Sequence, residues 1–255
     1  MKLFYDEAGQ GPNVVLLHGW GLHGGVWGDV THALSEHGHI IVPDFPGHGR
    51  SRDIVPRAYT SKVFAEEVTR LLPGPTVWVG WSLGALVTFS AARHFPEFVT
   101  KMALVGATPK FARTADWPYA TRSEVLNQFA HDLEHDYIPA LTRFLSLQVS
   151  TPEDREVLRQ LREELFRYGE PQATALRAGL KLLVEEDHRA AIPGFNVPTL
   201  IIHGERDQLV PVGAARFMAT QMKQARLEII PSAGHAPFLT HTDLFVEKLK
   251  DFIHG

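Results

Sequence analysis

Short apolar segments without alternation recur along this chain and restrict the folds it can adopt more than any other feature. A strand that is apolar at successive positions is typical of a parallel sheet whose two faces are both covered by helices. Stretches with helical periodicity lie between these segments, and the alternation predicts an α/β fold with a mostly parallel central sheet flanked by helices. The expected strands cover residues 14–17, 40–42, 77–79, 102–105 and 199–202, with a weaker one at 227–230, and the expected helices cover 26–36, 61–72, 83–94, 214–222 and 243–253.

The segment from residue 110 to residue 188 interrupts this alternation. It contains helical periodicity but no convincing strand. We interpret it as a helical cap, or lid, inserted over the carboxyl edge of the sheet, because active sites of open α/β sheets lie at that edge. The core would then consist of residues 1–109 and 189–255.

The composition limits the classes of function. The 255 residues, of which 44% are hydrophobic and 21% charged, fit one soluble globular domain with an insertion. A net charge of −4 argues against a nucleic-acid partner, and the absence of cysteine excludes disulfides and thiolate catalysis. The apolar runs are too short to span a membrane and the first residues show no signal peptide. We therefore expect a cytoplasmic protein without membrane contact, and a monomer by default.

The pentapeptide Gly80-Trp81-Ser82-Leu83-Gly84 is the clearest chemical motif. It follows the apolar run 77–79 and opens a helical pattern, which is the strand–turn–helix context of a G-x-S-x-G nucleophile elbow. Glycines on both sides allow the backbone to approach closely at a sharp turn. The sequence therefore predicts Ser82 as a nucleophile at a helix N-terminus, where backbone N–H groups favour a developing negative charge.

A serine nucleophile needs a base, and the base needs a group that orients it. His235 follows the last expected strand, and Asp207 follows the strand at 199–202, so both lie on loops at the carboxyl edge. The chain order Ser82, Asp207, His235 is the order of an α/β-hydrolase triad. We predict these three as the catalytic residues, with the backbone N–H groups of Trp20 and Leu83 as the oxyanion hole.

Other residues near these loops have competing interpretations. We expect His203 to be structural and His18 to shape the loop that carries Trp20. Glu205 is a less favoured alternative to Asp207 as the orienting group. The glycine-rich stretch 44–51 is interpreted as a structural loop. The sequence contains no H-E-x-x-H, P-loop or G-x-G-x-x-G motif, so we expect no metal and no cofactor.

These motifs together resemble the α/β-hydrolase superfamily, with serine in the elbow where the dehalogenase and epoxide-hydrolase branches carry aspartate. The segments at 18–21, 80–84, 144–148 and 234–238 more narrowly resemble the pimeloyl-acyl-carrier-protein methyl ester esterases of biotin synthesis. The resemblance implies hydrolysis of a carrier-linked methyl ester to methanol and a free carboxylate, with acyl-carrier protein as the partner. It also implies a substrate channel lined by Trp20, Ser82, Leu83, Phe144, Leu145, Ser146, Leu147, Gln148 and His235.

Carrier protein is acidic, so its docking surface should offer basic side chains. We expect a helix over residues 153–168. At about 100° per residue, Arg159 and Arg162 lie within about 40° of Arg155 on this helix, so the three form one arginine stripe. Arg143, just before Phe144, extends this stripe. Salt-bridged, solvated arginines are an equally good interpretation, because the segment 110–188 holds 10 Lys and Arg against 14 Asp and Glu.

Three alternative functions remain open from the sequence. A generalist carboxylesterase or lactonase acting on small free acyl esters would use the same triad. A hydrolase of carbon–carbon bonds would share the triad order, although no cap motif indicates it. A non-catalytic receptor with this fold is less favoured, because a receptor has no need of nucleophile, base and orienting group together.

Overall fold

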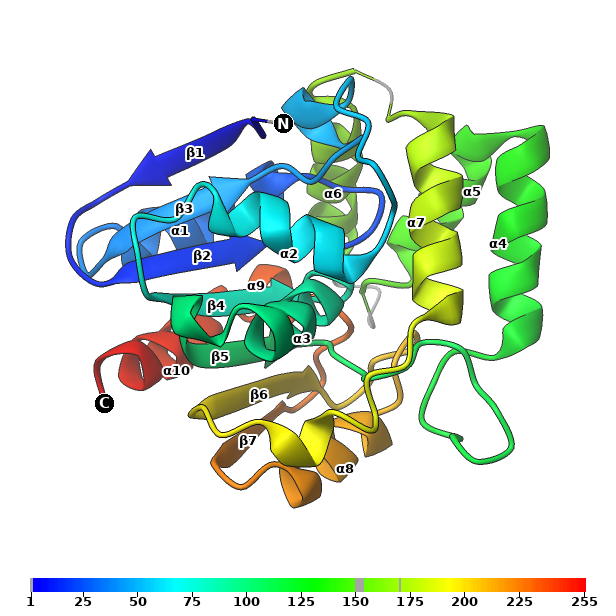
Figure 1. Ribbon diagram of the computed structural model, residues 1–255. Helices are drawn as coiled ribbons and strands as arrows, with labels where there is room; N and C mark the ends of the chain where they lie inside the picture. Colours follow the sequence, from blue (N-terminus) through cyan, green and yellow to red (C-terminus); the bar gives the residue numbers. More distant parts are fainter. Residues whose placement is uncertain (1, 150–153, 170) are drawn as a thin grey trace.

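The computed structural model describes residues 2–149, 154–169 and 171–255 and is built around a seven-stranded sheet (Figure 1). The strand order is β1-β3-β2-β4-β5-β6-β7, with β1 antiparallel to β3 and every other pairing in this sheet parallel. This confirms the expected α/β architecture. The strands are β1 Tyr5–Ala8, β2 Asn13–Leu17, β3 His39–Pro43, β4 Thr76–Trp81, β5 Val99–Val105, β6 Thr199–Gly204 and β7 Ala225–Ile230.

The apolar strands form the interior because helices cover both faces of the sheet. All six residues of β4 and all six of β6 are buried. Helices α2 and α3 pack together on one face, and α1 packs with α10 on the other (Figure 1). The core helices are α1 Gly28–Leu34, α2 Ser61–Thr69, α3 Leu83–His94, α8 Gly213–Gln221, α9 Pro237–Thr240 and α10 Thr242–His254, with short 3₁₀ turns η1 Gly24–Trp27, η2 Gly49–Ser51, η3 Pro96–Phe98 and η5 Ile192–Gly194.

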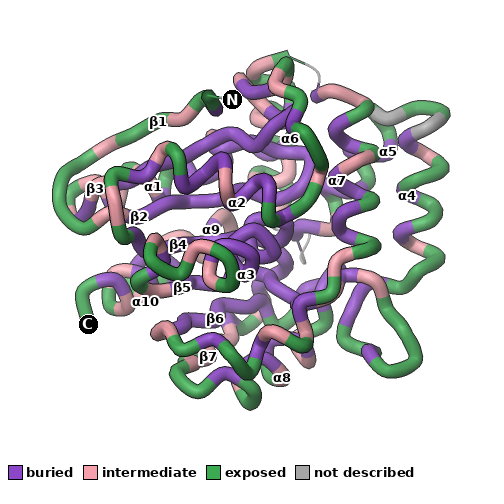
Figure 2. The backbone as a smooth tube through the Cα atoms, viewed as in Figure 1, coloured by how far each residue is buried: buried purple, intermediate pink, exposed green. Residues whose placement is uncertain are grey.

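Strand β1 is the one element of the sheet that sequence analysis did not predict. Its residues, Tyr5-Asp6-Glu7-Ala8, carry two charges and remain partly or fully exposed at the edge of the sheet (Figure 2). Its place comes from backbone pairing with β3, from Tyr5 opposite Pro43 to Ala8 opposite Ile40. An edge strand needs no apolar run, because one of its sides and much of its surface face solvent.

Residues 110–188 fold into helices in the parts that the structure describes. They are α4 Ser123–His135, α5 Tyr137–Ser146, α6 Arg155–Phe166 and α7 Ala173–Glu185. Helices α4, α5 and α7 stand together at one end of the sheet, and α6 contacts α5 and η1 (Figure 1). Glu153, the first residue of the helix expected over 153–168, lies outside the described residues. The division into core and cap at 110 and 188 remains our prediction.

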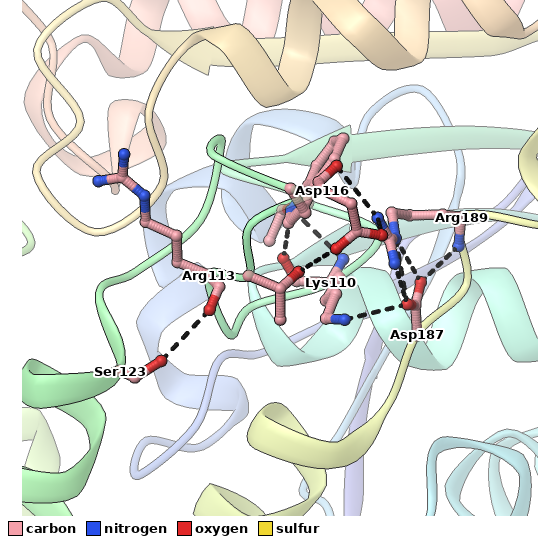
Figure 3. Close-up of polar contacts among 9 residues, drawn as sticks. Lys110, Arg113, Asp116, Ser123, Asp187 and Arg189 are labelled. Atoms are coloured by element: carbon pink, nitrogen blue, oxygen red, sulfur yellow. Dashed lines mark hydrogen bonds and ion pairs between the residues drawn. The ribbon is translucent and has the colours of Figure 1, made fainter.

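Charged side chains join the two ends of this helical segment to each other (Figure 3). Lys110 Nζ lies 3.3 Å from Asp187 Oδ2, and Arg189 Nη2 lies 2.7 Å from the same carboxylate oxygen. Arg189 Nη1 also contacts Asp116 Oδ2 at 2.8 Å. The hydrogen bond from Arg189 lowers the pKa of Asp187 to about 2, so this junction stays charged at neutral pH.

No helix within the described ranges has both the length and the hydropathy needed to cross a lipid bilayer.

Candidate active site

Ser82 occupies a sharp turn between β4, which ends at Trp81, and α3, which begins at Leu83. Its backbone has φ 56° and ψ −112°, a conformation that a residue with a side chain rarely adopts. Its N–H donates to Val105 O on the neighbouring strand at 3.0 Å. A Cβ at Gly80 would lie 2.4 Å from Gly84 O, and a Cβ at Gly84 would lie 2.4 Å from Leu17 O, so both glycines of the elbow are needed sterically. Strained turns of this kind are typical of functional sites.

His235 and Asp207 form a buried, hydrogen-bonded pair on adjacent loops at the carboxyl edge. His235 Nδ1 donates to Asp207 Oδ2 at 2.7 Å, because the carboxylate can only accept. Asp207 Oδ1 accepts the backbone N–H groups of Leu209 at 2.9 Å and Val210 at 2.8 Å. Nε2 of His235 is therefore unprotonated in the neutral ring, and it has no hydrogen-bond partner in the described part of the chain. A base nitrogen held in this way can accept a proton.

The electrostatics keep Asp207 ionised. Burial by itself would raise the pKa of Asp207, but its electrostatic interactions with His235 and His203 and its hydrogen bonds to His235 and to the N–H of Val210 outweigh it. The pKa of Asp207 is therefore below its ordinary value. An ionised carboxylate fixes the tautomer of His235 and stabilises the imidazolium that forms when Nε2 takes a proton.

Two residues that sequence analysis did not assign hold His235 in place. The indole Nε1 of Trp81 donates to His235 O at 2.9 Å. Gly106, at φ 52°, lies so close that an added Cβ would be 2.8 Å from His235 O and 3.0 Å from Nδ1. Sequence patterns contain only weak signals for these roles, because Trp81 is the variable position of the elbow and Gly106 is a single glycine after β5.

The loop that carries Trp20 is fixed to the core by His18. Phe45 N–H donates to His18 Nε2 at 2.9 Å, so the ring proton is on Nδ1 and donates to Gly19 O at 2.8 Å. Burial and the electrostatic interaction with the neighbouring His48 keep the pKa of His18 well below its ordinary value, so the ring stays neutral. Leu83 is the first residue of α3, and its N–H has no acceptor within the helix. The assignment of the Trp20 and Leu83 N–H groups as the oxyanion hole remains a proposal.

Ser82 and His235 open onto one narrow cavity. Trp20 and Phe144 from the predicted substrate channel also form its wall. The remaining wall comes from side chains that sequence analysis did not assign: Phe111, Thr121, Leu126, Phe129, Leu180, Leu183 and Leu209. Thr121 Oγ1 is occupied, because it donates to Leu209 O at 2.7 Å. The cavity wall therefore consists mainly of apolar side chains, together with Ser82 and His235.

The other predicted channel residues, Leu83, Leu145, Ser146, Leu147 and Gln148, are not part of the described cavity wall. Ser146 is exposed, and its Oγ donates to Arg143 O at 2.6 Å. Gln148 is buried and its Nε2 donates to Phe144 O. The backbone O of Gln148 accepts the N–H of Ala236, the residue after His235, at 3.3 Å. Successive residues on a helix point about 100° apart, so Phe144, Leu145 and Ser146 at the end of α5 face different directions.

Comparison with known proteins agrees with this geometry. The chain matches the alpha/beta hydrolase fold family over residues 12–242. The chain belongs to the α/β-hydrolase family. Two curated relatives of this hydrolase are the pimeloyl-[acyl-carrier protein] methyl ester esterases of Nitrosomonas europaea, 41% identical over 96% of this chain and 97% of the relative, and of Xanthomonas oryzae pv. oryzae, 43% identical over 97% of both. An esterase from Exiguobacterium antarcticum has the same fold, with a TM-score of 0.91, 24% identity and coverage of 99% of this chain and 96% of that one.

The rival residues of this α/β-hydrolase have structural contacts. His203 Nε2 donates to Val210 O at 2.9 Å inside β6. Glu205 is exposed, and its Oε2 accepts Ser232 N–H at 3.4 Å rather than a proton from His235. Asp44, in the loop 44–51, accepts Gly24 N–H at 2.8 Å and Arg50 Nε at 2.9 Å. Each group therefore stabilises a loop or strand.

A second cluster of serine, histidine and carboxylate lies where α7 returns to the core. Ser61 Oγ is buried and contacts Ser90 Oγ at 2.5 Å, whereas His188 Nε2 is 3.5 Å away. His188 Nε2 lies 2.9 Å from Glu186 Oε2, and Glu186 Oε1 accepts Ser61 N–H at 2.7 Å. In this hydrolase the cluster joins α2, α3 and the end of α7, and Ser61 does not line the cavity onto which Ser82 and His235 open.

Proposed function

We propose that this hydrolase cleaves the methyl ester of a pimeloyl chain carried by acyl-carrier protein, releasing methanol and leaving a free carboxylate. The observation that carries the chemistry is the His235–Asp207 pair with a free Nε2, which shares one apolar cavity with Ser82 on a strained elbow. The substrate is supported by relatives of that name, 41% and 43% identical over nearly the whole chain.

The acylation step begins at Ser82. Its Oγ attacks the ester carbonyl carbon while His235 Nε2 takes the hydroxyl proton. The carbonyl oxygen becomes an oxyanion beside the N–H groups of Trp20 and Leu83, and Asp207 stabilises the imidazolium. When the tetrahedral intermediate collapses, the bond to the methoxy oxygen breaks and His235 returns the proton to it. Methanol leaves, and the acyl chain remains on Ser82.

Deacylation repeats the sequence with water. His235 Nε2 takes a proton from water, the hydroxide oxygen attacks the acyl carbon, and a second tetrahedral intermediate forms at the same oxyanion position. Its collapse returns the proton to Ser82 Oγ and releases the carboxylate. The apolar wall suits a methylene chain, because the cavity offers few polar groups beyond those that react.

The carrier-docking arginines belong to this proposal. Arg155, Arg159 and Arg162 are exposed on α6, which carries three arginines and three glutamates in all. Arg159 already contacts Glu156 and Glu163, each at 2.5 Å, and Arg143 Nη2 contacts Asp132 at 2.6 Å. Acidic side chains of the carrier would compete with these internal partners, so electrostatic docking would be sensitive to salt.

Replacing the nucleophile tests the chemistry. Ser82→Ala should lower kcat by about 10⁴-fold or more with the fold retained, because the acyl-enzyme cannot form. The measurement is hydrolysis of a p-nitrophenyl ester, with circular dichroism to verify folding. Near-normal turnover by a folded Ser82→Ala variant would overturn the mechanism.

A second measurement tests the substrate and the docking surface together. We expect kcat/KM for carrier-linked pimeloyl methyl ester to exceed that for a short p-nitrophenyl ester, and to fall about tenfold or more in Arg155→Glu/Arg159→Glu and with added salt. Arg216→Glu, on α8, is the matched control. A preference for the free ester that neither salt nor substitution changes would instead indicate a generalist esterase with solvated arginines.

A further inference from the structure

The indole of Trp20 connects the loop after β2 to helix α7. Its Nε1 donates to Leu176 O in α7 at 2.9 Å, and the side chain is 1% exposed. One turn further along α7, Gly179 lies against the same ring, and an added Cβ there would be 2.8 Å from Cδ1 and 3.1 Å from Nε1 of Trp20. Phe144 from α5 packs edge-on against the indole, with ring centroids 4.8 Å apart.

The backbone beside Trp20 is also close to these helices. Gly21 has φ 78°, and an added Cβ would lie 3.2 Å from Leu141 Cδ2 and 3.8 Å from Leu176 Cδ2. On the other side of Trp20, His18 anchors the loop to the core through Gly19 and Phe45. The loop is therefore held at one end by the core and at the other by α5 and α7.

Movement of α7 would disturb this arrangement. A buried indole N–H is costly to leave without an acceptor, and Leu176 O is the acceptor that it has. Any displacement of α7 therefore either pulls the indole with it or breaks that hydrogen bond. Because the ring and the backbone N–H belong to one residue, a shift of the ring is passed to the N–H.

We propose that Gly179 is a positioning residue for ester hydrolysis: its missing side chain lets α7 seat against the Trp20 indole, and this contact sets the Trp20 backbone N–H at the oxyanion. The inference rests on the oxyanion assignment in the proposed function. Gly179 touches no reacting atom, and it acts through Trp20. Helix α7 thus contributes to catalysis as well as to the cavity wall.

The direct test is Gly179→Ala with a short p-nitrophenyl ester as substrate. We expect kcat to fall about 10-fold to 100-fold with KM changed less than about threefold, because oxyanion stabilisation acts mainly on the transition state. Alanine's higher helix propensity should offset part of the cost of overpacking, so any fall in the thermal midpoint should be small. Gly194→Ala is the matched control, because no heavy atom lies within 4 Å of its added Cβ and it should keep wild-type kcat.

A double-variant cycle separates positioning from general damage. Trp20→Phe removes the N–H donor and the part of the ring that faces Gly179, so it should lower kcat by itself and reduce the further effect of Gly179→Ala. The proposal is overturned if the losses of kcat in the two single variants simply add in the double variant. It is also overturned if Gly179→Ala leaves kcat unchanged or changes only KM. If Gly179→Ala fails to fold, an unchanged kcat in Trp20→Phe would overturn it.

Failure of the proposed function gives a different result. If wild type and Ser82→Ala hydrolyse the ester equally, the serine mechanism itself is wrong. If wild type is active, Ser82→Ala is inactive and Gly179→Ala equals wild type, only the positioning role is wrong.

Discussion

At the scale of single residues, the proposed mechanism depends on how the two oxygens of Asp207 are used. One oxygen accepts two backbone N–H groups, from Leu209 and Val210, and the other accepts the Nδ1 proton of His235. The backbone bonds prevent the carboxylate from rotating. The hydrogen bond to Nδ1 leaves Nε2 as the nitrogen of His235 that is free to act as a base.

Asp207→Asn should lower kcat by about 10³-fold to 10⁴-fold. The two backbone N–H groups require an oxygen, so the amide NH₂ must face His235 Nδ1 and the ring must move its proton to Nε2. The base is then lost although the side-chain volume is conserved. The measurement is kcat on a p-nitrophenyl ester, with Glu205→Gln as the control that should keep wild-type activity. An active Asp207→Asn variant together with an inactive Glu205→Gln would assign the orienting role to Glu205.

At the scale of secondary-structure elements, the helical segment 110–188 is attached to the core by paired charges and hydrogen bonds. Glu186, directly after α7, binds the first N–H of α2 through Oε1 and His188 through Oε2. Burial by itself would raise the pKa of Glu186, but the hydrogen bonds from His188 and Ser61 outweigh it and lower that pKa. Glu186 thus caps one helix while it ends another.

Glu186→Ala should lower the free energy of unfolding by about 1–3 kcal/mol, because it leaves Ser61 N–H and His188 without their acceptor. Since the folded pKa of Glu186 is depressed, its contribution is complete above its unfolded pKa and is lost as the pH falls through the folded pKa. Urea denaturation at pH 7 measures the difference, with the exposed Glu185→Ala as the control. Equal midpoints for Glu186→Ala and wild type would contradict this role.

At the scale of the whole molecule, the sheet brings loops from distant parts of the sequence to one edge and buries several histidines there. His18, His48 and His203 are fully buried, and burial lowers the pKa of each. Burial lowers the pKa of His48 to about 4. The folded state therefore holds these rings neutral at pH values where the unfolded chain protonates them.

Acid should destabilise the protein well above the pKa range of carboxylates. A depressed histidine pKa means that the unfolded state binds more protons, so the free energy of unfolding falls as the pH drops below about 6.5. From pH 7 to pH 5 the expected loss for His48 is about 2 kcal/mol. Urea denaturation across this range measures the slope, which His48→Gln should reduce and His131→Gln, at an exposed position, should not. A flat profile for wild type would contradict the argument.

The sequence alone determined the parts of this protein that are local in origin. Runs of apolar residues predicted six strands of the sheet. For the interior strands the reason is that a strand buried on both faces must be apolar along its length, whereas the weaker run at 227–230 belongs to the edge strand β7. The sequence also predicted Ser82, Asp207 and His235 as the catalytic residues, because each follows a strand and parallel strands end at one edge. The relatives that match nearly the whole chain bear the name of the esterase family that the sequence motifs resemble.

Only the tertiary structure decided which side chains meet. The cavity wall takes Phe111, Leu126, Leu180 and Leu209 from separate segments, and of the stretch 144–148 it takes Phe144 alone. The packing of α7 against the loop after β2 placed Gly179 on Trp20, and pairing with β3 made β1 a strand. Periodicity reports which face of an element is apolar. The partner of that face depends on how helices and loops pack across the sheet, which no local pattern contains.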